Sequence, residues 1–100
     1  MGTQFIFRWL PDSHDHLREF PKAIQTSIVR SILQQLQNQP TEETKHRKKL
    51  RPNKLANWEL RVGDYRVYYE VLEDDQIVEI VAVGRKDHNA LRIGGEEVEL

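Results

Sequence analysis

The chain has 100 residues, of which 38% are hydrophobic and 31% are charged, and it contains no cysteine. This length fits one domain over residues 1–100 and excludes a two-domain protein or a repeat array. The absence of cysteine excludes a disulfide scaffold, a thiolate metal site and a thiol nucleophile. No apolar run reaches the roughly 18 residues that span a bilayer, and the first eight residues lack the layout of a signal peptide. We therefore expect a cytoplasmic protein without a membrane segment.

The formal net charge of −1 conceals an uneven distribution of charge along the chain. Residues 45–66 contain eight basic and two acidic residues, a balance of +6, whereas the remainder contains seven basic and 14 acidic residues, a balance of −7. Such a division within a small domain indicates a local site for a polyanion rather than a generally basic protein. A charge run is also typical of a solvated loop, and this alternative stays open.

A strand is predicted over residues 4–10, where aromatic and β-branched side chains precede Pro11. A short helix is predicted from about His14 to Phe20, with Asp12 and Ser13 placed to accept hydrogen bonds from its first free N–H groups. The two segments predict that the domain opens with a strand and a helix.

A longer helix is predicted with Pro21 at its first position and its end before Pro40. Its apolar residues recur at spacings of three and four, which predicts a single apolar stripe: Ile24, Ile28, Val29, Ile32, Leu33 and Leu36. Residues 41–57 have no apolar periodicity, and we expect a charged connection there, partly helical at its start. A connection of this length in a compact domain is usually functional or mobile.

From Trp58 onward, apolar and polar residues alternate in the manner of β-strands. Strands are predicted over 58–62 and 65–72 around a Gly63-Asp64 turn, and over 77–83 after a polar turn. The last of these is apolar except for Glu79, as expected of a central strand covered on both faces.

The order strand, helix, helix and three strands predicts a two-layer α+β domain, with an antiparallel sheet and both helices on one face. The other face would then be free to carry a site. The Gly94-Gly95 pair predicts that residues 96–100 fold back, either as an added strand or as a cover over the basic site.

Residues 58–66, Trp-Glu-Leu-Arg-Val-Gly-Asp-Tyr-Arg, resemble the second-to-third-strand hairpin of the RelE/ParE toxin superfamily. The resemblance continues through Val-Tyr-Tyr-Glu-Val at 67–71 and Ile-Val-Ala-Val-Gly-Arg-Lys at 80–86. More loosely, it extends backward through the strand–helix–helix order and covers essentially the whole chain. It implies the toxin of a bacterial type II toxin–antitoxin system, closer to the RelE branch.

The resemblance also implies an activity and a set of partners. RelE toxins are mRNA interferases: they cleave mRNA in the ribosomal A site by attack of the nucleotide's own 2′-hydroxyl, without metal or other cofactor, and so inhibit translation. ParE toxins share the fold but poison DNA gyrase. In both branches a cognate antitoxin wraps the toxin, and operator DNA is bound through that complex. A gyrase inhibitor, or a toxin relic that retains only antitoxin and operator binding, remains the alternative, because fold analogy cannot choose an activity.

Three residues match the catalytic positions of RelE enzymes: Arg66 after the Gly-Asp-Tyr turn, and the basic pair Arg85 and Lys86. Arginine suits a pentavalent phosphate because its planar fork holds two oxygens and stays protonated. From strand alternation, Arg66 is expected to share the uncovered face with Tyr68. An ion pair of Arg66 with Glu59 or Glu79 is the alternative interpretation.

Other positions differ from the RelE pattern. Asn57 and Glu59 stand where some RelE enzymes have two lysines, and Arg92 or no residue stands where they have a C-terminal tyrosine. Glu59 is a candidate general base, although an ion pair with Arg61 or Arg66 is favoured. His14 and His16, near two aspartates, lack the third ligand and the spacing of a metal site.

The basic segment supplies the candidates for contact with the RNA backbone, whose binding is strongly salt-dependent: Lys45, Arg47, Lys48, Lys49, Arg51, Lys54 and Arg61. Tyr68 and Tyr65 are candidates for stacking on a flipped-out base. His46, within the basic run, is a further candidate for proton transfer.

Overall fold

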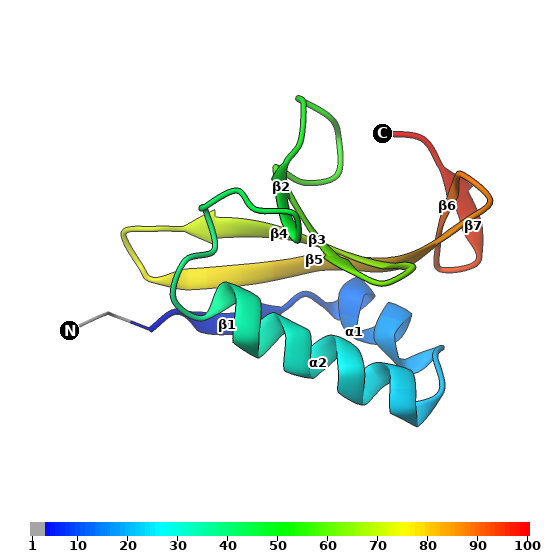
Figure 1. Ribbon diagram of the computed structural model, residues 1–100, viewed down its shortest axis with the longest axis horizontal. Helices are drawn as coiled ribbons and strands as arrows, with labels where there is room; N and C mark the ends of the chain where they lie inside the picture. Colours follow the sequence, from blue (N-terminus) through cyan, green and yellow to red (C-terminus); the bar gives the residue numbers. More distant parts are fainter. Residues whose placement is uncertain (1–3) are drawn as a thin grey trace.

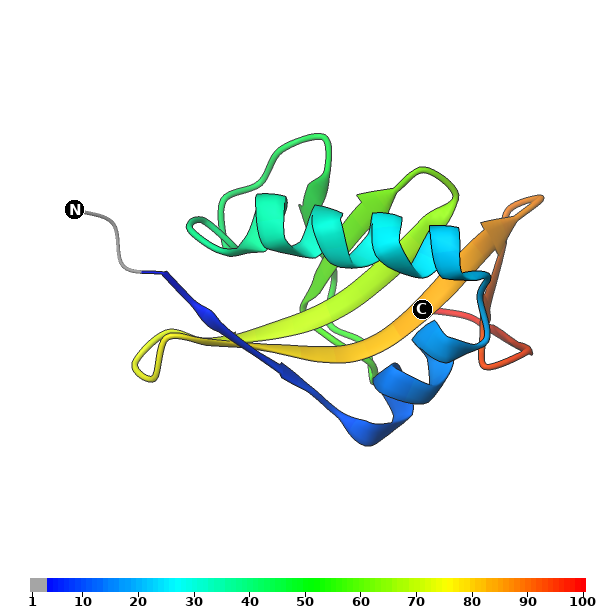
Figure 2. The ribbon, with the colours of Figure 1, turned by 90° about the horizontal axis from the view of Figure 1, so that it is seen from below.

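The computed structural model describes residues 4–100 as two helices and seven strands in a single sheet (Figure 1). In chain order the elements are β1 (Ile6–Trp9), α1 (Pro11–Arg18), α2 (Lys22–Leu36), β2 (Arg47–Lys49), β3 (Trp58–Val62), β4 (Tyr65–Leu72), β5 (Ile77–Asp87), β6 (Ala90–Ile93) and β7 (Glu96–Val98). Both helices lie on one face of the sheet (Figures 1 and 2), so the predicted two-layer α+β class is confirmed.

The sheet follows the path β2-β3-β4-β5-β6-β7, and all neighbours on this path are antiparallel. β1 lies off the path and pairs with the first part of β5 in parallel, a departure from the predicted antiparallel sheet. β1 and β6 thus share one edge of β5, at its beginning and at its end. Figure 2 shows β1 alongside the first part of β5 and leading into α1, while α2 lies over β3 and β4.

Both helices begin close to, but not at, the predicted residues. α1 begins at Pro11, three residues early, because proline suits a first turn whose N–H groups have no partner within the helix. The Ser13 hydroxyl donates to the carbonyl of Leu10 (2.7 Å) instead of capping the N–H groups. Pro21 is the N-cap of α2 rather than its first helical residue.

The apolar stripe of α2 is only partly buried against the sheet. Ile28, Ile32 and Leu36 are buried at spacings of four, whereas Val29 and Leu33 are 37% and 45% exposed. The six-residue stripe predicted from the sequence was therefore too broad. Ile28 and its buried neighbours pack on β3, β4 and β5 in the main core, together with Val67 and Tyr69.

Residues 41–57 contain β2 and turns but no helix, so the helical prediction for their start was wrong. β2 pairs with β3, an interaction across a loop that local periodicity does not reveal. The tip of the loop is ordered by Asn53, whose side-chain nitrogen donates to the carbonyls of Arg51 (2.7 Å) and Ala56 (2.9 Å).

β5 continues four residues beyond its predicted end at Val83 because Gly84 stays within the strand. A Cβ at Gly84 would lie 2.6 Å from the carbonyl oxygen of Arg92 and 2.8 Å from Cγ1 of Ile93, so glycine allows β6 to approach closely. β6 then turns at Gly94 and Gly95, both with positive φ, into β7. The predicted return of the chain as an added strand is confirmed.

The face of the sheet opposite the helices is not bare, contrary to the prediction. A second, smaller cluster lies there, built on Tyr68, Ala82, Leu91 and Ala56, with flanking side chains from residues 50–55 and β7. Figure 1 shows the loop between β2 and β3 and the β6–β7 hairpin rising on this side. Side chains of these two walls line a hollow between them. Within residues 4–100, neither helix has the length and apolar character needed to cross a membrane.

Candidate functional site

A cavity of about 530 Å³ lies between these two walls, on the face of the sheet away from the helices. We call it the basic cavity. Its basic side chains come from β2, the β2–β3 loop, β3 and β5: Lys48, Arg51, Arg61 and Lys86. The floor includes Tyr68 and Leu91, and Val98, Glu99 and Leu100 form part of the wall. Residues 98–100 thus lie beside the basic residues, in agreement with the alternative that residues 96–100 cover the basic site.

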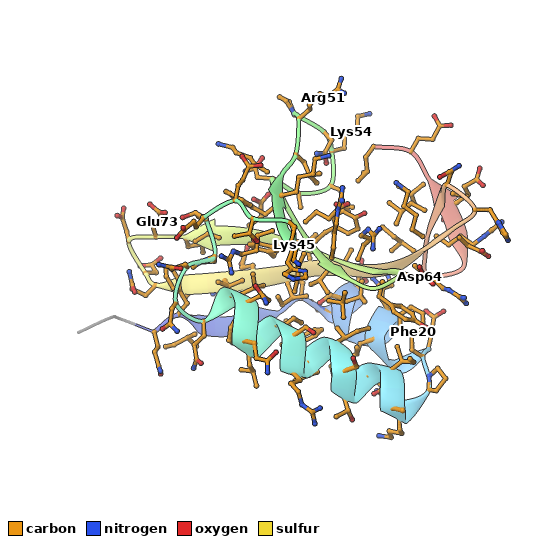
Figure 3. The ribbon with its side chains drawn as sticks, in the orientation of Figure 1. Phe20, Lys45, Arg51, Lys54, Asp64 and Glu73 are labelled. Atoms are coloured by element: carbon orange, nitrogen blue, oxygen red, sulfur yellow. The ribbon has the colours of Figure 1, made fainter. Side chains whose placement is uncertain are left out.

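Strand alternation explains which basic residues reach the basic cavity. Lys48 lies opposite Glu59 in the β2–β3 register, and Arg61 follows Glu59 by two residues on the same face of β3. Lys86 lies opposite Leu91, which belongs to the cluster on this face. Figure 3 shows Arg51 and Lys54 at the far end of the β2–β3 loop. Lys54 lines a neighbouring hollow with Leu55 and Leu100 rather than the basic cavity itself.

The remaining basic residues of the predicted stripe lie elsewhere. Arg47 is 8% exposed, and its guanidinium donates to the carbonyl of Glu42 (2.7 Å) and to both the carbonyl (2.7 Å) and the side chain (3.0 Å) of Gln35 in α2. Its assignment to an RNA-contacting stripe is therefore corrected to a structural role. By alternation Lys49 shares this helix-side orientation, while Lys45 and half-buried His46 precede β2 and do not line the basic cavity.

Arg85 and Lys86 do not act as a pair, because consecutive strand residues point to opposite faces. The guanidinium of Arg85 lies over the ring of Tyr65, 5.9 Å from its centroid. Tyr65 in turn meets the edge of Phe20 at 5.1 Å and packs against the helix-side core, so it is not placed to stack on a base in the basic cavity, contrary to the expectation. Arg85 and Tyr65 are thus separated from Lys86 by the sheet. Both residues belong to β5, which extends to Asp87.

Arg66 lies at the end of the hairpin, next to but not lining the basic cavity. Its Nη1 donates to the carbonyls of Gly63 (2.7 Å) and Tyr65 (2.9 Å). The alternative ion pairs are not formed, because Glu79 binds Arg8 (2.6 Å) and Glu59 binds Arg61 (3.2 Å).

Glu59 is a buried carboxylate at the floor of the basic cavity. Its Oε2 accepts from Nε of Arg61 (3.2 Å), and its Oε1 accepts from the hydroxyl of Tyr68 (3.0 Å). The favoured ion pair with Arg61 is confirmed. The bond to Tyr68 was not foreseen, although the pairing of two predicted strands could have suggested it, since Glu59 and Tyr68 face each other in register.

Tyr68 is only 1% exposed, so its ring has no free face on which a base could stack. Burial, followed by the charge of Glu59 and its hydrogen bond, raises the pKa of Tyr68 well above the ordinary tyrosine range, and the nearby charges of Arg66 and Arg61 oppose this. The phenol therefore remains protonated and stays a donor. The expectation that Tyr68 is a stacking platform is corrected to a structural donor.

The positions that differ from the RelE pattern lie apart. Asn57 is exposed just before β3, where its N–H donates to Glu70 (3.3 Å). Arg92 lies opposite Arg85 in the β5–β6 register and so points away from the basic cavity. Among residues 4–100, no three His, Asp or Glu side chains converge to form a metal site.

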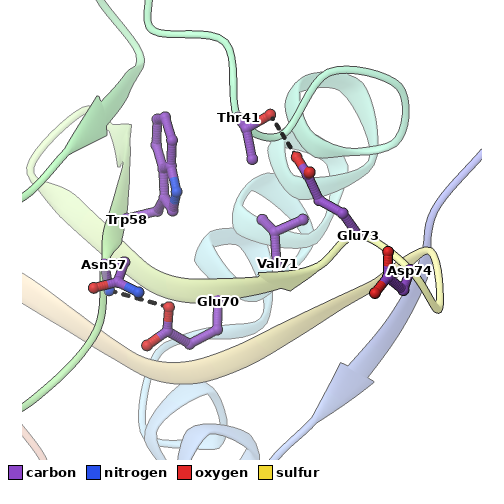
Figure 4. A pocket seen from close by; sticks show the side chains of 7 residues that line it. All are labelled: Thr41, Asn57, Trp58, Glu70, Val71, Glu73 and Asp74. Atoms are coloured by element: carbon purple, nitrogen blue, oxygen red, sulfur yellow. Dashed lines mark hydrogen bonds between the residues drawn. The ribbon is translucent and has the colours of Figure 1, made fainter.

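Another hollow, of about 380 Å³, lies at the other end of β4 and is lined by acidic side chains. Figure 4 shows Glu70, Glu73 and Asp74 along it, with Glu73 accepting from the hydroxyl of Thr41 (3.3 Å). Its carboxylates would repel a polyanion, in contrast to the cations of the basic cavity.

The fold and the basic cavity together define a small α+β domain with a candidate anion site on the face opposite its helices. A model of the ParE toxin of type II toxin–antitoxin systems (parDE) matches residues 7–90. The chain therefore belongs to this toxin family, within the RelE/ParE superfamily.

The solved structures support the same fold. A chain from the crystal structure of the toxin–antitoxin complex RelBE2 of Mycobacterium tuberculosis aligns with a TM-score of 0.71 and 22% identity, covering 82% of the present chain and 98% of its own length. No curated protein sequence matches the chain. One comparison is with ParE and the other with a RelBE complex, so neither chooses between the activities of the two branches.

Proposed function

We propose that this toxin binds RNA in the basic cavity and cleaves mRNA on the ribosome, so that translation stops. The observation that carries the proposal is the convergence of four basic side chains, from four separate parts of the chain, on one cavity. Its volume of about 530 Å³ falls within the range of roughly 300–1,000 Å³ found for ligand pockets. Clustered Lys and Arg side chains neutralise phosphates and release counterions.

The proposed reaction needs no group beyond the chain and the RNA. The 2′-oxygen attacks the adjacent phosphorus, and the bond from phosphorus to the 5′-oxygen breaks. The 2′-hydroxyl loses a proton, and the departing 5′-oxygen gains one. The products are a 2′,3′-cyclic phosphate and a 5′-hydroxyl. Lys86 and Arg61 would stabilise the extra charge on the pentavalent phosphate, with Arg66 at the adjoining hairpin. Removal of one such group costs about 2.7–4 kcal/mol of barrier.

Induced expression in a bacterial host tests this proposal. We expect growth arrest with cleavage of ribosome-bound mRNA at defined codon positions, abolished by Lys86→Ala and by Arg66→Ala. Arg85→Ala is the matched control for Lys86, because its side chain lies on the other face of the same strand. Unimpaired growth, or arrest that neither variant relieves, would contradict the proposal.

A second candidate function is inhibition of DNA gyrase. The match to the ParE family supports it, as do Asn57 and Glu59 at positions where some RelE enzymes have lysines. Purified toxin would then block supercoiling by gyrase while cellular mRNA stays intact. Cleaved mRNA with normal supercoiling would decide for the first candidate.

We also propose a cognate antitoxin as a partner, with operator DNA bound through the complex. The similarity to a chain from a toxin–antitoxin complex supports this partner. Co-expression with the product of the adjacent gene tests it. Relief of growth arrest and co-purification are expected, and an adjacent gene product that does neither would contradict it. A relic that retains only these interactions would bind the antitoxin without arresting growth.

A further inference from the structure

We propose that Tyr68 and Glu59 are positioning residues that hold the guanidinium of Arg61 toward a phosphate in the basic cavity. The inference rests on the proposed function, because it assigns roles within the site where RNA is proposed to bind. In this arrangement Arg61 meets the RNA, while Tyr68 and Glu59 act through Arg61.

A chain of hydrogen bonds runs from the interior of the protein into the basic cavity. The Tyr68 hydroxyl donates to Oε1 of Glu59 (3.0 Å), and Nε of Arg61 donates to Oε2 (3.2 Å). Tyr68 is 1% exposed and Glu59 8%, whereas 44% of the Arg61 side chain is exposed. Tyr68 and Glu59 are therefore buried, whereas the guanidinium of Arg61 that they hold faces solvent.

The register of the hairpin makes this support rigid. Tyr68 lies directly opposite Glu59 across β3 and β4, and Arg61 lies two residues beyond Glu59 on the same face. The Tyr68 ring is fixed by the second apolar cluster, with Ala82 and Leu91. A carboxylate held by such a phenol has little freedom to turn away from Arg61.

The bond at Nε leaves the terminal nitrogens of Arg61 as the edge that an anion would meet. A guanidinium has five N–H donors in a planar fork, and Nε supplies one of them. A long side chain normally loses rotamer freedom when it binds a phosphate. An arginine already fixed at Nε loses less, so preorganisation strengthens binding.

Because Glu59 is negatively charged, the positioning role and simple electrostatics predict opposite changes in RNA affinity when Glu59 is neutralised. A carboxylate among Lys48, Arg51 and Lys86 repels phosphate, so simple electrostatics predicts tighter RNA binding when it is neutralised. If Glu59 positions Arg61, Glu59→Gln instead weakens binding, because the loss of Arg61 orientation outweighs the gain from removing a negative charge. The two effects have opposite directions.

The main test titrates purified full-length protein with a fluorescent single-stranded RNA dodecamer carrying 2′-O-methyl groups, which block cleavage. Affinity is measured by anisotropy at several salt concentrations. Tyr68→Phe, which removes one oxygen without changing charge, should weaken binding about fivefold. It should also flatten the salt dependence, by at most the roughly 0.7 in slope that complete loss of one phosphate contact produces, because Arg61 keeps its charge but is no longer held at the phosphate. Tyr65→Phe, on the helix side, is the matched control and should leave both values unchanged.

A double variant separates positioning from general loss of stability. Tyr68→Phe added to Arg61→Ala should cause no further weakening, because the supported group is already absent. In the free protein, the Arg61 Nε–H resonance should be protected from exchange and should lose this protection in Tyr68→Phe. This second readout depends on neither RNA nor activity.

The outcomes distinguish the inference from the proposed function. If Arg61→Ala weakens RNA binding but Tyr68→Phe keeps the wild-type slope and Nε–H protection, the positioning role is overturned and RNA binding stands. Tighter binding by Glu59→Gln also overturns it. If the wild-type chain does not bind the dodecamer, or Arg61→Ala and Lys86→Ala leave binding unchanged, the proposed site fails and the inference fails with it.

Discussion

Replacing Arg47 or Lys48 by alanine is expected to separate fold stability from RNA binding at two adjacent basic residues. The Arg47 guanidinium is buried and makes three hydrogen bonds, two of them to Gln35 in the last turn of α2. It thereby neutralises the negative end of the helix dipole. Lys48 points to the other face and lines the basic cavity.

The hydrogen bonds of Arg47 set the expected magnitude. A bond from a charged donor contributes about 1.5–3 kcal/mol, and three bonds made by one group do not add fully, so Arg47→Ala should lower the free energy of unfolding by about 3–4 kcal/mol. With a urea m-value near 1 kcal/mol/M for a small domain, the unfolding midpoint should fall by about 3–4 M. Lys48→Ala should change stability by less than about 0.5 kcal/mol.

The assay combines urea unfolding, followed by circular dichroism, with the RNA titration below the unfolding transition. Lys48→Ala should flatten the salt dependence of RNA binding by about 0.7 in slope, while Arg47→Ala should leave the slope unchanged. Equal unfolding midpoints for the two variants would refute the structural role of Arg47. A folded Arg47→Ala protein with a flattened slope would instead place Arg47 at the RNA.

Gly84→Ala should cost about 1–3 kcal/mol in urea unfolding, because the added Cβ would lie 2.6 Å from a backbone oxygen; wild-type stability would contradict the close approach of β6. Burial raises the pKa of Tyr68 and Tyr69 above the ordinary value of about 10, so the unfolded chain releases these protons first, and the urea midpoint should fall as pH rises above about 10. A midpoint constant from pH 9 to 11 would count against this. Glu99→Gln removes a negative charge from the wall of the basic cavity and should tighten RNA binding about two- to fivefold in the anisotropy titration. Unchanged affinity would show that the tail does not screen the site.

Local patterns predicted α2, β3 and β4 because each has a clear period over several residues. They did not predict β2, whose three residues form a strand only through pairing with β3. They ended β5 too early because Gly84 reads as a terminator, whereas in the fold it admits β6. Both errors concern contacts between segments, which single-segment periodicity does not contain.

The candidate site shows the same contrast between features that one segment reveals and features that depend on strand pairing. The resemblance to RelE toxins made Lys86 a candidate and the basic segment included Arg61, and the structure brings both side chains to the basic cavity. Alternation along the predicted strands also placed Arg66 on the same face as Tyr68. The side chains of Arg47 and Arg85 were misjudged because one belongs to an unpredicted strand and the other to an unpredicted extension of β5. Without those strands, alternation could not be applied to either residue.

The charge balance of +6 over residues 45–66 is therefore an indirect guide to the position of the proposed polyanion site. A stripe along residues 45–66 would place every basic side chain on one surface, but the sheet sends Arg47 into the helix interface and Lys48 into the basic cavity. Lys86 comes from the acidic remainder of the chain and joins Arg61 there. Since the same cavity also contains the buried carboxylate of Glu59, net charge alone would not account for the phosphate binding proposed there. We expect the orientation of the individual cations to contribute, and this orientation follows from the register of β3 with β4.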